Sequence, residues 1–396
     1  MLSAFRNDLP AASAVWEPAP EFSFVGGNND AASIPFTGLA EALVTALRRE
    51  GQNLATYNLG GSPLGYEPLR EFVMSELGAR AGMAGSADQV LIVSGSLQAL
   101  DLVNRAMLSP GDTIVIEMAT YGGMVSRLAA IGVDYVGVEL DEHGIDVGHL
   151  RTVFEDLRDQ GVTPKYLYTI PTVQNPTGSV MPLDRRHQVL ELCREFGVPI
   201  FEDECYADLT WGCERPPSLR ALDGATSSGG GQVVYCGSFS KSIAPALRVG
   251  YIVADEPVIR QLNALKSDAG TGALEQLALA EYCPNNFDGH VERLIDALKA
   301  KGDAMVAAVR REFGDEVHVT EPMGGIYVWL TFPEGTDTES FQAEANAAGI
   351  QFNPGAGWSA DPTWGRNRLR LCFGAPTIET IDAGVAELAS IWRSSR

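Results

Sequence analysis

The segment that most constrains the fold of this 396-residue chain is Ser238-Phe239-Ser240-Lys241-Ser242-Ile243-Ala244-Pro245-Ala246-Leu247-Arg248, just after the apolar run Val233–Cys236. A lysine that follows a buried strand among hydroxyl groups, seven residues before an arginine, suits a site in which the amine of Lys241 forms an imine with an aldehyde. Ser238, Ser240 and Arg248 would then hold a phosphate by hydrogen bonds and charge. The alternative is an ordinary strand-to-helix loop with a solvated lysine.

On both sides of this segment, short apolar runs alternate with amphipathic stretches. The runs are typical of buried strands: Val90–Val93, Thr113–Ile116, Tyr166–Ile170, Pro199–Glu202, Val233–Cys236 and Tyr251–Ala254. Helical patterns include Leu39–Arg49, Leu97–Met107, Leu183–Glu195 and Val258–Lys266. This alternation predicts an α/β fold with a mostly parallel sheet that helices cover on both faces. Such sheets bind ligands at the carboxyl ends of their strands, where the polar motifs of this chain fall.

The same pattern divides the chain into three parts. We expect residues 1–50, which begin irregularly and rich in proline, to contribute to a small domain and to the substrate site. Residues 51–285 form the predicted large domain. Residues 286–396 form the predicted small α+β domain, with a long helix at Val291–Phe313, a strand at Gly325–Phe332 and a terminal helix from Thr377.

Two polar motifs follow predicted strands ahead of the lysine. Asn175-Pro176-Thr177-Gly178 is either a plain turn or a rigid turn that presents the amide of Asn175 to a ligand. Glu202-Asp203-Glu204-Cys205-Tyr206 is either a solvated loop or a site in which Asp203 faces a pyridine nitrogen. We expect no metal there, because no histidine lies nearby in the sequence.

Two further motifs are suited to binding anions. Gly95-Ser96-Leu97 joins the strand Val90–Val93 to a helix, and the free N–H groups of such a turn can bind phosphate. Arg370 stands at the centre of the alternating strand Leu369–Phe373, where an arginine needs a partner. The partner is either an internal carboxylate or the α-carboxylate of an amino acid, which suits the planar guanidinium.

Composition limits the partners of the protein. The formal net charge of −22 argues against nucleic acid and anionic membranes as partners, because both need a positive face. The six cysteines are scattered without a C-x-x-C pair, as in a protein with reduced thiols. The first twenty residues have no apolar run typical of a signal peptide, so we expect a cytoplasmic protein.

Together and in this order, these motifs resemble the fold-type I pyridoxal-5′-phosphate (PLP) enzymes of the class I/II aminotransferase group. The chain is most similar to the branch of 2-aminoadipate and kynurenine aminotransferases, from about Phe22 to the last helix. The resemblance implies PLP as cofactor, a large sheet of seven strands, amino-acid and 2-oxo-acid substrates, and a homodimer with its active site at the subunit interface.

The resemblance also implies roles for individual residues. Lys241 matches the Schiff-base lysine, and Tyr121 matches the aromatic residue that stacks on the pyridine ring. Asp203 matches the partner of the ring nitrogen, Asn175 and Tyr206 match the partners of the phenolic oxygen, and Arg370 matches the α-carboxylate clamp. The phosphate contacts correspond to Gly95, Ser96, Leu97, Ser238, Ser240 and Arg248, with Tyr57 reaching the phosphate of the neighbouring subunit. Gly27 and Asn28 lie in a segment that borders the substrate.

Three departures from the family pattern bear on the ligands. Leu97 stands where close relatives usually carry a polar residue. Asn28-Asn29-Asp30 replaces an apolar residue and a proline, and Glu17-Pro18 lies about where the aminoadipate-type enzymes place an arginine for the distal carboxylate. If these acidic and amide side chains line the pocket, a cationic or polar substrate should be preferred over a dicarboxylic one. Otherwise Glu17 is simply solvated.

Two other functions use the same residues or the same fold. A PLP enzyme that activates Cα in the same way can instead catalyse elimination, cyclisation or oxidation of an amino acid. An aminotransferase-like domain can also act as a ligand sensor in a DNA-binding regulator, but that function needs a basic face, and this chain is strongly acidic.

Overall fold

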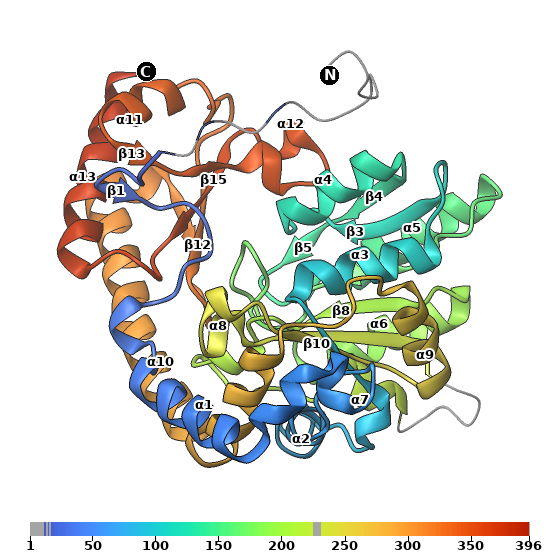
Figure 1. Ribbon diagram of the computed structural model, residues 1–396. Helices are drawn as coiled ribbons and strands as arrows, with labels where there is room; N and C mark the ends of the chain where they lie inside the picture. Colours follow the sequence, from blue (N-terminus) through green and yellow to red (C-terminus); the bar gives the residue numbers. More distant parts are fainter. Residues whose placement is uncertain (1–11, 13–14, 16, 225–230, 396) are drawn as a thin grey trace, which may run out of the picture.

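The computed structural model of the protein describes residues 12, 15, 17–224 and 231–395 (Figure 1). The predicted irregular start at residues 1–11 lies outside the described residues. Two sheets with their helices make up most of the described chain. The larger is built from residues between Val90 and Val253, and the smaller from the C-terminal part.

The large sheet has seven strands in the order β2-β10-β9-β8-β7-β3-β4. Their bounds are β2 Val90–Val93, β3 Thr113–Glu117, β4 Asp134–Val138, β7 Leu167–Thr169, β8 Ile200–Asp203, β9 Val233–Ser238 and β10 Gly250–Val253. The strands from β9 to β4 are parallel, whereas β10 runs antiparallel to both β2 and β9. The predicted α/β fold with a mostly parallel sheet of seven strands is confirmed, with one antiparallel strand inside it.

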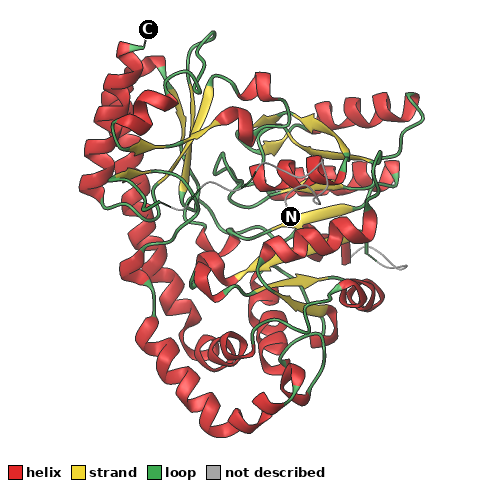
Figure 2. Ribbon diagram, turned by 45° about the horizontal axis from the view of Figure 1, so that its top comes forward, coloured by secondary structure: helices red, strands yellow, loops and turns green. Residues whose placement is uncertain are grey.

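Apolar side chains on both faces explain why these strands appear in the sequence as continuous apolar runs. In β2, Val90 and Ile92 pack into one core, and Leu91 and Val93 pack into another. Helices lie on both sides of the yellow strands in Figure 2. They are α1 Phe36–Glu50, α3 Ser96–Met107, α4 Gly122–Ile131, α5 Val147–Asp159, α6 Leu183–Phe196, α7 Leu219–Gly224 and α9 Glu256–Leu265.

The edge strand β4 was not among the predicted strands. Asp134 is exposed, and the next three residues of β4 are only half-buried. Edge strands need fewer apolar residues than central strands, because one of their sides is unpaired. With Asp134 and Gly137 in it, this strand has no continuous apolar run for the pattern to detect.

The small sheet has four strands in the order β11-β12-β15-β14, all antiparallel to their neighbours. They are β11 His318–Thr320, β12 Tyr327–Thr331, β14 Asn353–Pro354 and β15 Arg368–Cys372, and α13 (Ile378–Ser394) packs into the same core. Phe24, from the N-terminal part of the chain, also packs in this core. The strand β1 (Phe22–Ser23) pairs with β13 (Ile350–Gln351). A segment near the start of the described chain therefore completes the C-terminal part.

One helix, α10 (Ala273–Phe313), is 41 residues long and packs both on α1 and on α13 (Figure 1). The predicted start at Val291 is wrong, because the helix continues through Pro284. Proline lacks a donor and usually ends a helix, but α10 runs from Ala273 to Phe313 with Pro284 inside it. The predicted domain boundary at residue 285 falls inside α10, and the division into domains stays a prediction.

The remaining regular elements are short. They are α2 Glu67–Phe72, α8 Phe239–Ser242, α11 Gln342–Ala347, α12 Pro362–Gly365, β5 Leu140–Asp141 and β6 Gly144–Ile145. Within the described residues, we find no helix with the length and apolar character to cross a bilayer.

Candidate active site

A cavity of about 390 Å³ lies where the carboxyl ends of the large-sheet strands meet the small sheet. The strand-end segments contribute Ser96, Tyr121, Asn175, Asp203 and Lys241 to its wall. The small sheet supplies residues from β12, β14 and β15. The predicted site residues that line the cavity are Gly27, Ser96, Leu97, Tyr121, Asn175, Asp203, Tyr206, Ser240, Lys241, Arg248 and Arg370.

Lys241 lies in the single turn α8, directly after β9. Its amine donates a 2.6 Å hydrogen bond to the carbonyl of Gly27 and lies 5.6 Å from the centre of the Tyr206 ring. Burial lowers the pKa of Lys241, because the charged form loses its hydration. A lysine with a depressed pKa keeps more of its amine in the neutral form that can act as a nucleophile or base. Because this amine is buried at the cavity wall, the alternative of a solvated loop lysine does not hold.

Asp203 ends β8 and is 6% exposed at the cavity wall. Its carboxylate accepts hydrogen bonds from the Tyr168 hydroxyl at 2.7 Å and from the backbone N–H of Cys205 at 3.2 Å. Burial raises the pKa of Asp203 above its ordinary value. A carboxylate in such a place is stabilised by a cationic partner, for example a protonated ring nitrogen.

Arg370 is 1% exposed at the centre of β15, and no carboxylate of the described residues pairs with it. Its guanidinium donates to the side-chain oxygens of Asn175 (3.0 Å) and Asn353 (2.8 Å) and to the carbonyl of Gly26 (3.0 Å). Its Nε is buried and donates to no described residue. The predicted alternative of an internal salt bridge is therefore wrong, and the guanidinium remains available to an anion in the cavity.

Arg370 is also held between two aromatic rings. Its guanidinium carbon lies 3.8 Å from the centre of the Tyr327 ring and 3.4 Å from that of Trp358. The hydroxyl of Tyr327 lies 2.9 Å from that of Tyr206, and the Tyr121 ring packs on Trp358 at 5.9 Å between centres. These rings fix the guanidinium and give this side of the cavity an aromatic wall.

The anion-binding motifs meet at the start of α3. Gly95 has a φ of +81°, and a Cβ there would lie 2.2 Å from a guanidinium nitrogen of Arg248, so only glycine allows this close approach. Arg248 donates to the hydroxyl of Ser240 at 3.4 Å and to the carbonyl of Ser94 at 3.3 Å. Ser238 is buried behind them and caps α8 through Ser240 N. A helix N-terminus beside an arginine and a hydroxyl is suited to a phosphate.

Several predicted residues lie outside this cavity. Tyr57 is 82% exposed, and Asn28 and Glu17 are also exposed. Asp30 is buried in an ion pair with Lys301 at 2.7 Å, and Asn29 donates to the backbone of Lys241. The acidic and amide side chains on which the cationic-substrate hypothesis depended do not line the cavity, so that hypothesis is not confirmed.

The prediction missed wall residues that come from the small sheet. Tyr327 and Asn353 line the cavity because β12 and β14 pair with β15, which places Asn353 directly opposite Arg370. Trp358 ends the 3-10 turn Gly355–Trp358 that follows β14. The strand containing Tyr327 was predicted, but its pairing depends on contacts between distant segments, and no local pattern reports them. Tyr168, the donor to Asp203, was likewise hidden inside an apolar strand.

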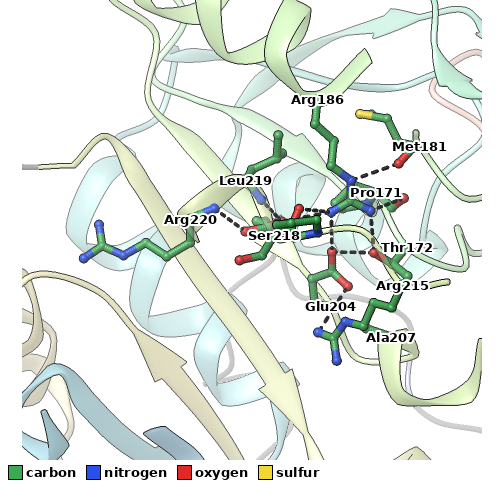
Figure 3. Close-up of polar contacts among 12 residues, drawn as sticks. Pro171, Thr172, Met181, Arg186, Glu204, Ala207, Arg215, Ser218, Leu219 and Arg220 are labelled. Atoms are coloured by element: carbon green, nitrogen blue, oxygen red, sulfur yellow. Dashed lines mark hydrogen bonds and ion pairs between the residues drawn. The ribbon is translucent and has the colours of Figure 1, made fainter. Parts of the chain in front are cut away.

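A buried network supports the end of β8 from behind. Figure 3 shows Arg186 and Glu204 pointing toward each other, with Thr172 between them. Arg186 is fully buried and donates to Glu204 (3.4 Å), to the hydroxyl of Thr172 (2.7 Å) and to three backbone carbonyls. Glu202 accepts from the backbone N–H groups of Leu219 and Arg220. Because side chains alternate along a strand, this network anchors the two glutamates on one face while Asp203 faces the cavity.

Known proteins share both the sequence and this fold. The family model described as aminotransferase class I and II matches residues 29–388. The chain is 35% identical over 369 residues to a 2-aminoadipate transaminase of Thermus thermophilus, covering 92% of this chain and 88% of that protein. It is 32% identical over 376 residues to aromatic-amino-acid aminotransferase 1 of Thermococcus litoralis, covering 94% and 88%.

A solved structure agrees with these relatives. The α-aminoadipate aminotransferase of Thermus thermophilus, in complex with N-(5′-phosphopyridoxyl)-L-leucine, superposes with a TM-score of 0.86 at 33% identity and covers 94% of this chain and 92% of that one. The cavity of the present chain fits the same cofactor: a buried amine, a buried carboxylate, a phosphate-binding helix terminus and an arginine with a free Nε share one wall. The chain therefore belongs to the aminotransferase class I and II family and transfers amino groups with PLP as its cofactor.

Proposed function

We propose that this aminotransferase prefers L-amino acids with an aromatic or other apolar side chain. The observation that carries this proposal is the charge of the cavity wall: among the described residues that line it, the cations are Lys241, Arg248 and Arg370. Each of these has a role at the cofactor or at the α-carboxylate. A second carboxylate on the substrate would find no cation of its own, and an unpaired buried charge costs several kcal/mol.

The rest of the wall suits an apolar side chain. Leu97, Ile170, Pro245, Tyr121 and Trp358 contribute apolar or aromatic surface. Burying an aromatic side chain against such a surface contributes about 2 kcal/mol relative to leaving it in water. The relative from Thermococcus litoralis that is named an aromatic-amino-acid aminotransferase supports this choice.

Lys241 is the residue proposed to carry the cofactor and to move the proton. When bound, PLP supplies an electron sink conjugated with the substrate Cα. The amine of Lys241, which burial keeps in its neutral form more readily, would take the proton from the substrate Cα and later return it. Asp203, held by Tyr168 and Cys205 N, would keep the ring nitrogen of the bound cofactor protonated.

Other residues bind and orient. Ser96 at the α3 N-terminus, with Ser240 and Arg248, holds the phosphate, and Ser238 and Gly95 shape this site. Tyr121 stacks on the ring. Arg370, which lines the cavity and pairs with no carboxylate of the described residues, binds the α-carboxylate of the substrate. Asn175 and Tyr206 bond the phenolic oxygen, and Gly27, which lines the cavity, borders the substrate.

We further propose a homodimer in which Tyr57 reaches the phosphate of the neighbouring subunit. Tyr57, at 82% exposure, lies close in sequence to three other exposed apolar side chains: Phe36 (75%), Val44 (47%) and Leu54 (44%). Exposed apolar groups gathered in one segment are typical of a subunit interface. All six cysteines are free thiols, which supports the reducing cytoplasm as the location.

A substrate panel tests the proposed preference. We expect kcat/KM for phenylalanine, tyrosine and leucine to exceed that for glutamate and 2-aminoadipate by at least about tenfold, or 1.4 kcal/mol. Arginine, ornithine and lysine should also be poor, since the wall offers no acidic residue besides Asp203. Faster turnover of the dicarboxylic or cationic amino acids would contradict the proposal.

A further inference from the structure

Glu117, the last residue of β3, is fully buried and does not line the cavity. Its Oε1 accepts hydrogen bonds from the hydroxyl of Thr169 at 2.6 Å and from the backbone N–H of Ile170 at 3.1 Å. Its Oε2 accepts from the side-chain amide of Gln174 at 2.9 Å. All three donors belong to the segment that leads from the end of β7 to Asn175. One carboxylate therefore fixes this segment at three points.

Gln174 closes the turn from its other end. Its amide nitrogen also donates to the carbonyl of Ala119 at 2.6 Å, two residues before Tyr121. Its side-chain oxygen accepts from the backbone N–H and the hydroxyl of Thr177, at 2.8 and 2.9 Å. The side chain of Gln174 therefore connects the turn around Asn175 both to Glu117 and to the chain that presents Tyr121.

The next contact reaches the substrate side of the cavity. Asn175 accepts a 3.0 Å hydrogen bond from Arg370, and no described residue accepts from its own amide nitrogen, which leaves that donor for the cofactor. Burial raises the pKa of Glu117 to about 7, although its three donors oppose the shift. A network with such a group in it has large energetic consequences when one member is removed.

We propose that Glu117 and Gln174 are a positioning pair that fixes the amide of Asn175 between the cofactor and Arg370. The pair thereby sets the affinity for the α-carboxylate and the proton affinity of the cofactor's imine nitrogen. The proposal rests on the roles given above to Asn175 and Arg370. Neither member of the pair touches substrate or cofactor, and both act through the turn at residues 174–179.

The test uses the cofactor-loaded enzyme and two measurements. The first is KM and kcat for the amino donor. The second is the pH midpoint of the visible absorption change of the loaded enzyme without substrate, which needs no turnover. The variants are Glu117→Gln, which keeps the shape but turns a donor toward the amide nitrogen of Gln174, and Gln174→Met, which breaks the same link from the other side.

Reference variants separate the possible outcomes. Asn175→Ala and Arg370→Lys report on the roles that the pair is meant to serve. Tyr166→Phe is the matched control, because it removes a buried 2.5 Å hydrogen bond to Asn104 just before β7, at the end of the strand away from Asn175. The unfolding temperature of every variant is measured, so that lost stability is distinguished from lost positioning.

We expect Glu117→Gln to raise KM by about tenfold with kcat changed less, the size of one lost buried hydrogen bond. Its spectral midpoint should move in the same direction as that of Asn175→Ala, by a smaller amount. The exchanged pair Glu117→Gln with Gln174→Glu restores one donor–acceptor contact and should recover part of the loss. Tyr166→Phe should leave both KM and the midpoint unchanged.

Two results would overturn the inference. One is a wild-type KM and midpoint in both Glu117→Gln and Gln174→Met while Asn175→Ala and Arg370→Lys show their effects. The other is an equal change in Tyr166→Phe, which would make the effect a general consequence of weakened packing. If instead Asn175→Ala and Arg370→Lys leave KM and the midpoint at their wild-type values, the proposed roles in substrate and cofactor binding fail.

Discussion

At the scale of single residues, three buried carboxylates at strand ends are sensitive to pH. Glu117 ends β3, and Glu202 and Asp203 end β8; all three are at 6% exposure or less, and burial raises the pKa of each. Each is compensated differently: Glu117 by three neutral donors, Glu202 by two backbone N–H groups and Arg186, and Asp203 by Tyr168. Asp203 lines the cavity and the other two carboxylates lie behind it, so protonation of these groups is expected to depend on pH even before substrate binds.

The titration of Glu117 should be visible in the stability of the protein. Its pKa rises from 4.5 to about 7 in the folded state, so between these values the folded chain binds a proton that the unfolded chain has released. The contribution of Glu117 to the unfolding free energy should therefore decrease as pH rises from 5 to 7 and stay constant above 7. The total decrease should be a few kcal/mol at most.

Denaturant unfolding of wild type and Glu117→Gln at several pH values between 5 and 8 measures this effect. The free energy of unfolding of wild type, taken relative to the variant, should fall as pH rises over that range. A difference that grows with pH would mean that the folded state favours the ionised form instead.

The sequence predicted most of the cofactor side of the site but not its substrate side. Lys241, Asp203, Asn175 and Arg248 each stand next to a strand end that an apolar run marks, so local pattern and position agree. Residues such as Asn353 enter the cavity only because β14 pairs with β15, a contact that the sequence does not encode locally. Glu117 comes directly after the predicted strand Thr113–Ile116 and was given no role, because its donors lie more than fifty residues away in the sequence.

At the scale of elements, the arrangement depends on how strand ends are tied to the loops that follow them. Arg186 projects from α6 and joins the residues after β7 to the end of β8, as Figure 3 shows. Asn175 and Asp203 lie on these two elements. A single guanidinium therefore sets the relative position of two segments that both contact the cofactor in the proposed site.

Replacing this guanidinium should destabilise the protein strongly. In Arg186→Met, Glu204, the Thr172 hydroxyl and three carbonyls each lose one donor inside the core. We expect the free energy of unfolding to fall by roughly 3–5 kcal/mol, as when one partner of a buried ion pair is removed. Denaturant unfolding measures the loss.

Arg151→Met is the matched control. Arg151 makes two hydrogen bonds to Glu195, at 3.0 and 2.8 Å, but its side chain is 45% exposed. Its loss should leave the free energy of unfolding almost unchanged, because exposed ion pairs contribute little to stability. Equal effects of the two substitutions would show that the buried network does not stabilise the sheet end.

At the scale of the whole molecule, the proposed homodimer makes each site depend on two chains. A site that takes Lys241 from one subunit and Tyr57 from the other predicts complementation. The variants Lys241→Ala and Tyr57→Ala should each be impaired alone, the first completely. When they are mixed as unfolded chains and refolded together, half of the dimers are hybrids, and each hybrid contains one intact site.

Activity in the refolded mixture should therefore recover to roughly a quarter of the wild-type value, as the symmetry of a two-fold dimer requires. Refolding Lys241→Ala with wild type provides the control. The activity of that mixture should equal the activity of the wild-type chains it contains, with no increase from hybrid dimers. A mixture no more active than refolded Tyr57→Ala alone would place Tyr57 outside the partner's site.

The cavity wall comes from two sheets that belong to separate hydrophobic cores. Cofactor binding and substrate preference can therefore depend on different parts of the chain. In the proposed site, the segments after β2, β7, β8 and β9 hold the cofactor, whereas β12, β14 and the turn that carries Trp358 border only the substrate side of the cavity. Mutations in the small sheet can thus alter the substrate preference while the cofactor stays bound. Proteins with this fold can therefore change their amino-acid substrate during evolution through intermediates that are all active enzymes.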